Sequence, residues 1–381
     1  MEHITFLVAM VIVTALAFDF TNGFHDTANA MATSIATGAL RPVVAVVISG
    51  VLNLVGAFLS TEVAKTISGG IVDDSLVTPG MIFAGLVGAI LWNLATWLLG
   101  LPSSSSHALF GGLIGAVWVG AGQHGVHFGQ VVEKILLPAV ASPLVAGVGA
   151  LFATYLAYRL TERARASRVD RGFRAGQVVS ASLVSLAHGT NDAQKTMGVI
   201  TLTLISAGAL DSGSGPPVWV IASAGLAMGL GTSIGGWRII RTMGKGLTDI
   251  RAPQGFAAEA SATTVILASA HLGFALSTTH VCSGGILGAG LGRRLAEVRW
   301  GTAGRMAAAW CITLPAAAAV GAVAAGVVVH GGTPGVVAVL LVTLAVAAFI
   351  VYMSRRNPVH SGNVNEAHTV PVRSTPTGAG V

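Results

Sequence analysis

Two short polar segments of this otherwise apolar chain carry carboxylates and amides at a spacing that could bind a cation. Residues 22–31 read Asn-Gly-Phe-His-Asp-Thr-Ala-Asn-Ala-Met, and residues 188–197 read His-Gly-Thr-Asn-Asp-Ala-Gln-Lys-Thr-Met. Asp26 and Asp192 hold the same position in the two copies. Since an unpaired carboxylate is costly in apolar surroundings, we expect both to be paired, bound to an ion or in contact with water.

Neutral oxygens around these carboxylates suit a hard monovalent cation. The predicted coupling-cation ligands are Asn22, Asp26, Asn29, Thr190 and Asp192. Positions three apart share one face of a helix, so Asn29 lies beside Asp26. For the same reason Lys195 lies beside Asp192. This lysine either helps to hold an anion or only neutralises the neighbouring carboxylate.

A second repeated motif is a run of hydroxyl residues followed by a histidine and a glycine-rich stretch. Residues 103–106 are four serines before His107, and residues 277–279 are Ser-Thr-Thr before His280. Each run predicts a helix N-terminus inside the membrane, where free N–H groups and the helix dipole attract an anion. Two such ends could hold a tetrahedral oxyanion from opposite sides, although either run could also be a cap without a ligand. The predicted substrate-binding residues are Ser103, Ser104, Ser105, Ser106, Ser277, Thr278, Thr279, Asn191, Gln194 and Lys195.

Titratable side chains in or near these segments suggest a proton relay. The candidates are His25, His107, His188, His280 and Glu259, and imidazole titrates near neutral pH. The competing interpretation is that these groups only cap helices and line a cavity. The histidine spacing lacks a compact ligand pattern such as His-Glu-x-x-His, so we predict neither a metal site nor a cofactor. Ser106 and His107 diverge on a helix, which disfavours a hydrolase, and no enzymatic activity is predicted.

The elements that position these motifs are predicted to be membrane-spanning helices. The chain of 381 residues is 53% hydrophobic and 9% charged, whereas a soluble domain has roughly 25% charged residues. Its mean hydropathy is +0.76. Apolar stretches long enough to cross a bilayer cover residues 4–20, 42–60, 81–100, 131–158, 218–237, 256–276, 302–330 and 335–353. We predict an all-α polytopic bundle of about 10–12 spans, with broken or re-entrant helices at the motifs. The surrounding partner is the lipid bilayer.

The repeated motifs divide the chain into two halves that we expect to be inverted. Residues 61–80 are acidic and the equivalent residues 237–254 are basic, so the positive-inside rule places them on opposite faces. The predicted organisation is an N-terminal repeat (1–157), a basic cytoplasmic loop (158–175), an inverted C-terminal repeat (176–330), an additional transmembrane helix (331–354) and a disordered tail (355–381). Since the net charge of +6 lies mainly in loops, no nucleic-acid partner is predicted. Glycines suited to close helix packing are compatible with a homodimer.

At these paired motifs the chain resembles the PiT family of inorganic phosphate transporters over nearly its whole length. The resemblance implies a multi-pass protein of the plasma membrane that imports phosphate by symport with a proton or sodium, alternately open to each side. Family members include some that take a neutral metal–phosphate complex and a few that move sulfate. The two copies differ, with His25 against Asn191 and Asn29 against Lys195. A sulfate or other oxyanion permease and an anion channel are the alternatives.

Overall fold

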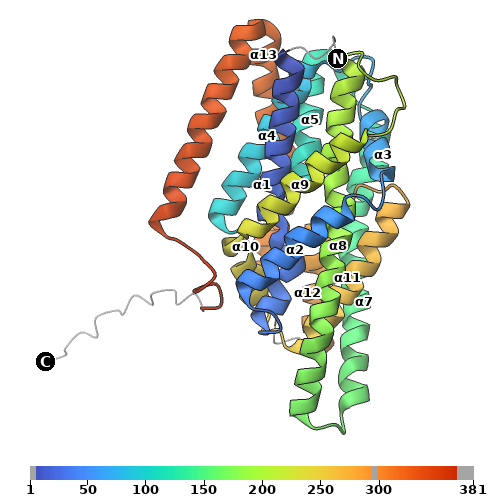
Figure 1. Cartoon of the computed structure of the whole chain (residues 1–381), viewed down its shortest axis with the longest axis vertical. Coiled ribbons are helices and arrows are strands. Elements are labelled where there is room, and N and C mark those ends of the chain that lie inside the picture. Colours follow the sequence, from blue (N-terminus) through green and yellow to red (C-terminus); the bar gives the residue numbers. More distant parts are fainter. Residues whose placement is uncertain (1–5, 294–297, 367–381) are drawn as a thin grey trace, which may run out of the picture.

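The computed structural model describes residues 6–293 and 298–366, which fold almost entirely into helices (Figure 1). The predicted all-α class is confirmed. Pairing of β type within these ranges is limited to two isolated bridges, Val72 with Val126 and Thr248 with Val298. The α-helices are α1 (Phe6–Ala36), α2 (Pro42–Gly56), α3 (Glu62–Gly70), α4 (Pro79–Leu99), α5 (Ser105–Ala121), α6 (Phe128–Val131), α7 (Leu137–Thr161), α8 (Ala166–Ser206), α9 (Val218–Ile234), α10 (Trp237–Arg241), α11 (Ala252–His271), α12 (Thr278–Arg293) and α13 (Trp300–Arg356).

Fewer helices than the expected 10–12 spans pass a test of length and hydropathy. The four that pass in the described part of the chain are α1, α4, α13 and the continuous segment Phe128–Thr161. A fifth would be α9 together with Trp237–Gly246, which are bent by 60°. The apolar helices α2 and α5 are too short to pass alone. In α13 the chain reverses at Gly332, whose φ is 54°, and the second arm runs along the outside of the bundle (Figure 1).

The carboxylate motifs lie within unbroken helices, which corrects part of the prediction. Residues 22–31 belong to α1 and residues 188–197 to α8, and neither helix is interrupted there. The expected breaks occur only at the hydroxyl runs, before α5 and before α12. The basic segment 158–175 is not a long loop either, because α7 continues to Thr161 and α8 already begins at Ala166.

The glycine of each carboxylate motif allows one helix to approach another closely. A Cβ added to Gly23 of α1 would lie 2.3 Å from the carbonyl oxygen of Met228 in α9. A Cβ added to Gly189 of α8 would lie 2.2 Å from the carbonyl oxygen of Asn53 in α2. Any larger residue would push these helix pairs apart. A glycine therefore holds each motif helix close to a neighbour, α1 against α9 and α8 against α2.

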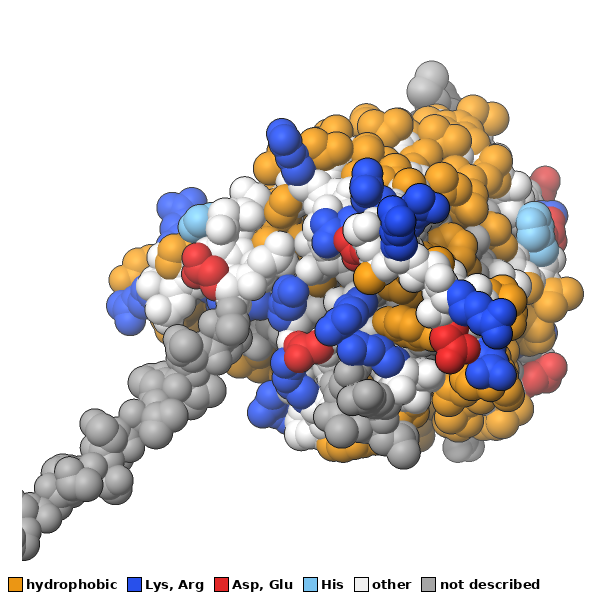
Figure 2. Space-filling view, turned by 90° about the horizontal axis from the view of Figure 1, so that it is seen from below, with side chains coloured by type: hydrophobic (Ala, Val, Ile, Leu, Met, Phe, Trp, Pro, Cys, Tyr) orange, Lys and Arg blue, Asp and Glu red, His pale blue; other side chains and the backbone are white. Residues whose placement is uncertain are grey.

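Basic side chains gather at the lower end of the molecule in Figure 1, as the view from below shows (Figure 2). This end carries the α7–α8 turn with its arginines and the α10 segment with Arg238 and Arg241. At the other end, the α3–α4 connection is acidic. There Ser75 donates its hydroxyl and its backbone N–H to Asp73, and these bonds lower the pKa of the Asp73 carboxyl.

Part of the C-terminal tail is ordered, so the prediction of disorder from residue 355 is wrong up to residue 366. The helix α13 reaches Arg356. Beyond it, the Arg241 guanidinium donates to the carbonyl oxygen of Asn363 at 2.7 Å, and the Asn365 amide donates to the carbonyl oxygen of Ile35 at 3.3 Å. These bonds attach the tail to the basic end. Residues 367–381 lie outside the described residues.

Candidate functional site

The helices α5 and α12 begin inside the protein, each capped by the serine of its hydroxyl run. The Ser104 hydroxyl accepts from the backbone N–H of His107 at 3.1 Å, and the Ser277 hydroxyl accepts from that of His280 at 3.3 Å. These two serines act as N-caps of their helices. The following residues of each first turn are buried and face the carboxylates of α1 and α8.

Asp26 sits between its own histidine neighbour and the first turn of α5. One carboxylate oxygen lies 2.6 Å from Nδ1 of His25, and the other accepts from the Ser105 hydroxyl at 2.7 Å. The opposite ring nitrogen of His25 lies 3.1 Å from the Thr96 hydroxyl, which in turn accepts from Ser103 at 2.8 Å. This carboxylate therefore ends a chain of hydroxyl and imidazole groups.

Asp192 is paired with a lysine that is only 1% exposed. The Lys195 ammonium donates to the first oxygen of Asp192, and the Thr278 hydroxyl donates to the second at 3.1 Å. The same ammonium donates to the Ser106 hydroxyl at 2.5 Å. A buried ammonium needs such partners because desolvation is costly. Lys195 thus connects the carboxylate of α8 to the N-terminus of α5.

His188 lies between the two carboxylates. Its Nε2 is 3.2 Å from Asp192 and 4.0 Å from Asp26, and its Nδ1 is 3.2 Å from the side-chain oxygen of Asn53. One donor atom from each of Asp26, His188 and Asp192 lies within 4.8 Å of the others. All three side chains are almost fully buried. The arrangement can hold one positive charge, either as a proton on His188 or as a cation bound among the three.

The contacts of the first motif recur in the second. Ser105 donates to Asp26, and its counterpart Thr278 donates to Asp192. Asn29 donates to the Thr279 hydroxyl at 3.1 Å, and to that of Thr278 at 3.3 Å. In the other copy Lys195 donates to Ser106, which holds the place of Thr279. Each carboxylate helix therefore contacts both hydroxyl runs, and the four segments form one cluster.

Known proteins are similar to this chain in sequence. A sequence profile described as the phosphate transporter family matches residues 22–168 and 158–321. The chain belongs to the phosphate transporter family. It is 59% identical to the probable low-affinity inorganic phosphate transporter of Mycobacterium bovis, over 94% of this chain and 87% of that protein. It is 44% identical to the protein of the same description from Bacillus subtilis, over 85% of this chain and 98% of that protein.

A solved structure shares the fold. The structure of a sodium-dependent phosphate transporter superposes with a TM-score of 0.70 at 22% identity, covering 85% of this chain and 99% of that chain. Membership of a transporter family agrees with the prediction that the protein is not an enzyme, and together with the apolar helices it places the chain in a membrane.

Several residues expected at the site of this family member do not hydrogen-bond the central carboxylates within the described part of the chain. The Gln194 side chain accepts from the backbone N–H groups of Val63 and Ala64 at 2.8 and 3.2 Å, which caps α3. The Thr190 hydroxyl donates to the carbonyl oxygen of Leu186 in its own helix. Asn191 and Asn22 are buried, with no hydrogen bond from their side chains in the part of the chain that is described.

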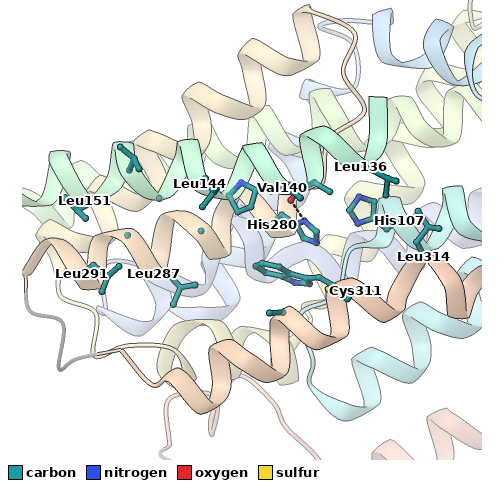
Figure 3. A pocket seen from close by; sticks show the side chains of 18 of the residues that line it. His107, Leu136, Val140, Leu144, Leu151, His280, Leu287, Leu291, Cys311 and Leu314 are labelled. Carbon is teal, nitrogen blue, oxygen red and sulfur yellow. Dashed lines mark hydrogen bonds between the residues drawn. The ribbon is translucent and has the colours of Figure 1, made fainter. Parts of the chain in front are cut away.

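Two of the histidines predicted to relay protons face an apolar cavity instead. Figure 3 shows His107 and His280 on its wall, with their rings 4.8 Å apart. The cavity, of about 690 Å³, lies among α7, α12 and α13. Nδ1 of His280 lies 3.1 Å from the carbonyl oxygen of Ala139. Neither ring is hydrogen-bonded to a carboxylate of the described residues, which favours the lining role.

Glu259 of α11 is buried in a cluster of its own. Its carboxylate accepts from the Thr33 hydroxyl at 2.5 Å, from the Gln177 amide at 3.2 Å and from the Ser180 hydroxyl. These donors come from α1 and α8, nearer to the basic end than the central cluster. Glu259 therefore does not contact the central carboxylates, although the same two helices carry both clusters.

Two residues of the centre were missed by the sequence analysis. Thr96 of α4 joins His25 to Ser103, and Asn53 of α2 contacts His188. Both are buried polar residues in apolar helices. That signal was present in the sequence, because an amide or hydroxyl within an apolar stretch needs a partner, but nothing in the spacing told which partner it has.

Proposed function

We propose that the protein imports inorganic phosphate across the plasma membrane by symport with a monovalent cation. The observation that carries this proposal is the cluster in which the N-termini of α5 and α12 meet two carboxylates and a buried lysine. Helix N-termini and hydroxyls suit a phosphate oxyanion, Lys195 supplies a positive charge, and the carboxylates suit a cation. The relatives named as phosphate transporters favour phosphate over sulfate.

The hydrogen bonds of the cluster suggest how the two solutes are coupled. Ser105 and Thr278 donate their hydroxyl hydrogens to Asp26 and Asp192. A cation bound by the carboxylates would replace these donors, since each carboxylate oxygen would then face a positive charge. The released hydroxyls would be free to donate to phosphate. Cation binding would therefore raise the affinity for phosphate, and by linkage phosphate would raise the affinity for the cation.

The antiparallel course of α1 and α8 supports inverted halves and alternating access. Asp26 of α1 lies beside His188 of α8, whereas Thr33, farther along α1, reaches the Glu259 cluster together with Gln177, which is earlier in α8. The equivalent helices thus run in opposite directions. With the arginine-rich end inside, rocking of the two halves would open the central cluster to each face in turn.

Uptake into proteoliposomes tests this function. Purified protein is reconstituted, and accumulation of radiolabelled phosphate is followed with an imposed sodium gradient, an imposed proton gradient or neither. We expect accumulation with at least one gradient, and competition by unlabelled phosphate but not by sulfate. No accumulation under either gradient contradicts symport. Rapid flux that follows only the membrane potential would indicate an anion channel.

A further inference from the structure

Asp19 of α1 is a carboxylate that no described protein group satisfies. Its side chain is 0% exposed, and neither oxygen has a hydrogen-bond partner within residues 6–293 and 298–366. The other buried carboxylates differ from it. Asp26, Asp192 and Glu259 each accept at least two hydrogen bonds from neighbouring side chains or pair with a basic group. Asp19 is the exception among the buried acids of the described part.

Two further unsatisfied side chains face this carboxylate. Asn22 of α1 and Thr196 of α8 lie close enough to Asp19 to interact with its carboxylate, but neither the Asn22 amide nor the Thr196 hydroxyl makes a hydrogen bond of normal geometry to any described residue. Each unsatisfied buried polar group costs about 1–3 kcal/mol. Five such atoms in one place are more readily explained by a bound group than by packing. Their chemistry, a carboxylate with neutral oxygens beside it, fits a small cation.

The position of Asp19 relates it to the central cluster. It precedes Asp26 by seven residues, so the two share a face of α1 and are about 10 Å apart along the helix axis. Thr196 lies one turn beyond Asp192 on α8. The site is therefore on the side of the centre where α1 begins, away from the basic end. His188 and Asp192 are the charged groups of α8 that act on Asp19.

We propose that Asp19, Asn22 and Thr196 form a second cation site, which takes one monovalent cation on the outer side of the central cluster. Co-transport of this cation with phosphate would rest on the proposed function, whereas its binding does not. The positive charge that neutralises the carboxylate can arrive as sodium or as a proton. The two sources share one chemistry, and separate measurements distinguish them.

Binding measured without phosphate tests the site independently of transport. Radioactive sodium is titrated onto purified protein in detergent, for the wild type and for Asp19→Asn, Thr196→Val and Thr203→Val. Thr203 is a matched control, because its buried hydroxyl donates to the carbonyl oxygen of Val199 in its own helix. If sodium occupies the site, Asp19→Asn loses one bound ion per protein. Thr196→Val lowers the affinity for that ion about tenfold, and Thr203→Val binds sodium as the wild type does.

A proton as the occupant gives a different result. Sodium binding is then unchanged in every variant. The wild type shows an infrared band from the carbonyl stretch of a neutral carboxylic acid, and this band titrates with pH. The band is absent in Asp19→Asn. The proposal is overturned if Asp19→Asn leaves both the sodium stoichiometry and the infrared titration as in the wild type. If size-exclusion chromatography shows that Asp19→Asn is misfolded, Thr196→Val decides instead. An unaltered sodium affinity together with an unshifted infrared band in Thr196→Val then overturns the proposal. Absent phosphate uptake by the wild type would refute the proposed function alone.

Discussion

The two carboxylate helices share a backbone plan and differ in charge. In α1, Asp26 is paired with His25 and Ser105, and the position three residues later is the neutral Asn29. In α8 the equivalent position is Lys195, whose ammonium bonds the carboxylate directly. The carboxylate of the α1 copy can thus still bind a cation, whereas the carboxylate of the α8 copy is already paired with an ammonium.

This difference suggests a division of labour that the repeat alone would not require. A carboxylate with imidazole and hydroxyl neighbours can exchange a cation as conditions change. A carboxylate with a buried ammonium already has a counter-charge, and its lysine has spare donors for an anion. We infer that the α1 copy senses the cation and that the α8 copy helps to fix phosphate. The predictions below test where the two copies differ in function and where they are equivalent.

The largest effect is expected from removing the carboxylates. Asp26→Asn should abolish cation-driven uptake, a loss of about 100-fold or more, or about 2.7 kcal/mol, while the protein remains folded. Asp192→Asn should also abolish uptake and should lower the unfolding temperature as well, because it leaves the Lys195 ammonium buried without its partner. Uptake and thermal unfolding of both variants check this. Equal stability of the two variants would argue against a permanent ion pair in α8.

Replacing the lysine should affect phosphate more than the cation. In Lys195→Met the KM for phosphate should rise about 30-fold, because an ammonium near the N-terminus of α5 is lost, while the cation concentration for half-maximal uptake changes little. Lys65→Met is the control, since Lys65 is half exposed and pairs with Glu62 at the surface. A selective change in cation dependence would assign Lys195 to neutralising Asp192 alone.

Sequence patterns predicted the membrane class, the helical fold and most residues of the cluster, because these follow from local chemistry. Apolar length predicts spanning helices, and two hydroxyl runs predict helix N-termini. The runs are indeed where α5 and α12 begin. The helix breaks expected at Asp26 and Asp192 are absent, because a polar residue in a helix can be satisfied by neighbouring helices without opening the backbone.

Other contacts come from long-range packing that no local pattern contains. Gln194 stands in the second motif but reaches the N-terminus of α3, and the histidines after the hydroxyl runs turn to a cavity lined by α7 and α13. Asn53 and Thr96 stand far from either motif in sequence and enter the centre only because α2 and α4 pack there. The tail was expected to be disordered from its composition, yet Arg241 binds it.

The hydroxyl donors should have smaller and equivalent effects. Ser105→Ala and Thr278→Val each remove one hydrogen bond to a central carboxylate, and each should lower the affinity for phosphate about tenfold. Thr203→Val should transport as the wild type does, because the Thr203 hydroxyl donates to a backbone carbonyl and not to these carboxylates. Phosphate titrations of uptake at a saturating cation concentration check this. An effect of only one of the two variants would mean that phosphate is held by one helix N-terminus rather than by both.

The smallest effect is expected at Asn29, the neutral counterpart of Lys195. Asn29→Ala removes the amide donor to Thr278 and Thr279 but no charge, so uptake should fall only about threefold, or about 0.7 kcal/mol. Asn29→Lys is the sharper variant, because it gives α1 the charge of α8. If the two copies are functionally unequal, this second ammonium should pair with Asp26, occupy the place of the cation, and make phosphate uptake insensitive to the cation gradient. Phosphate uptake by Asn29→Lys, measured with and without the cation gradient, tests this. If uptake still depends on the cation, Asp26 is not where the cation acts.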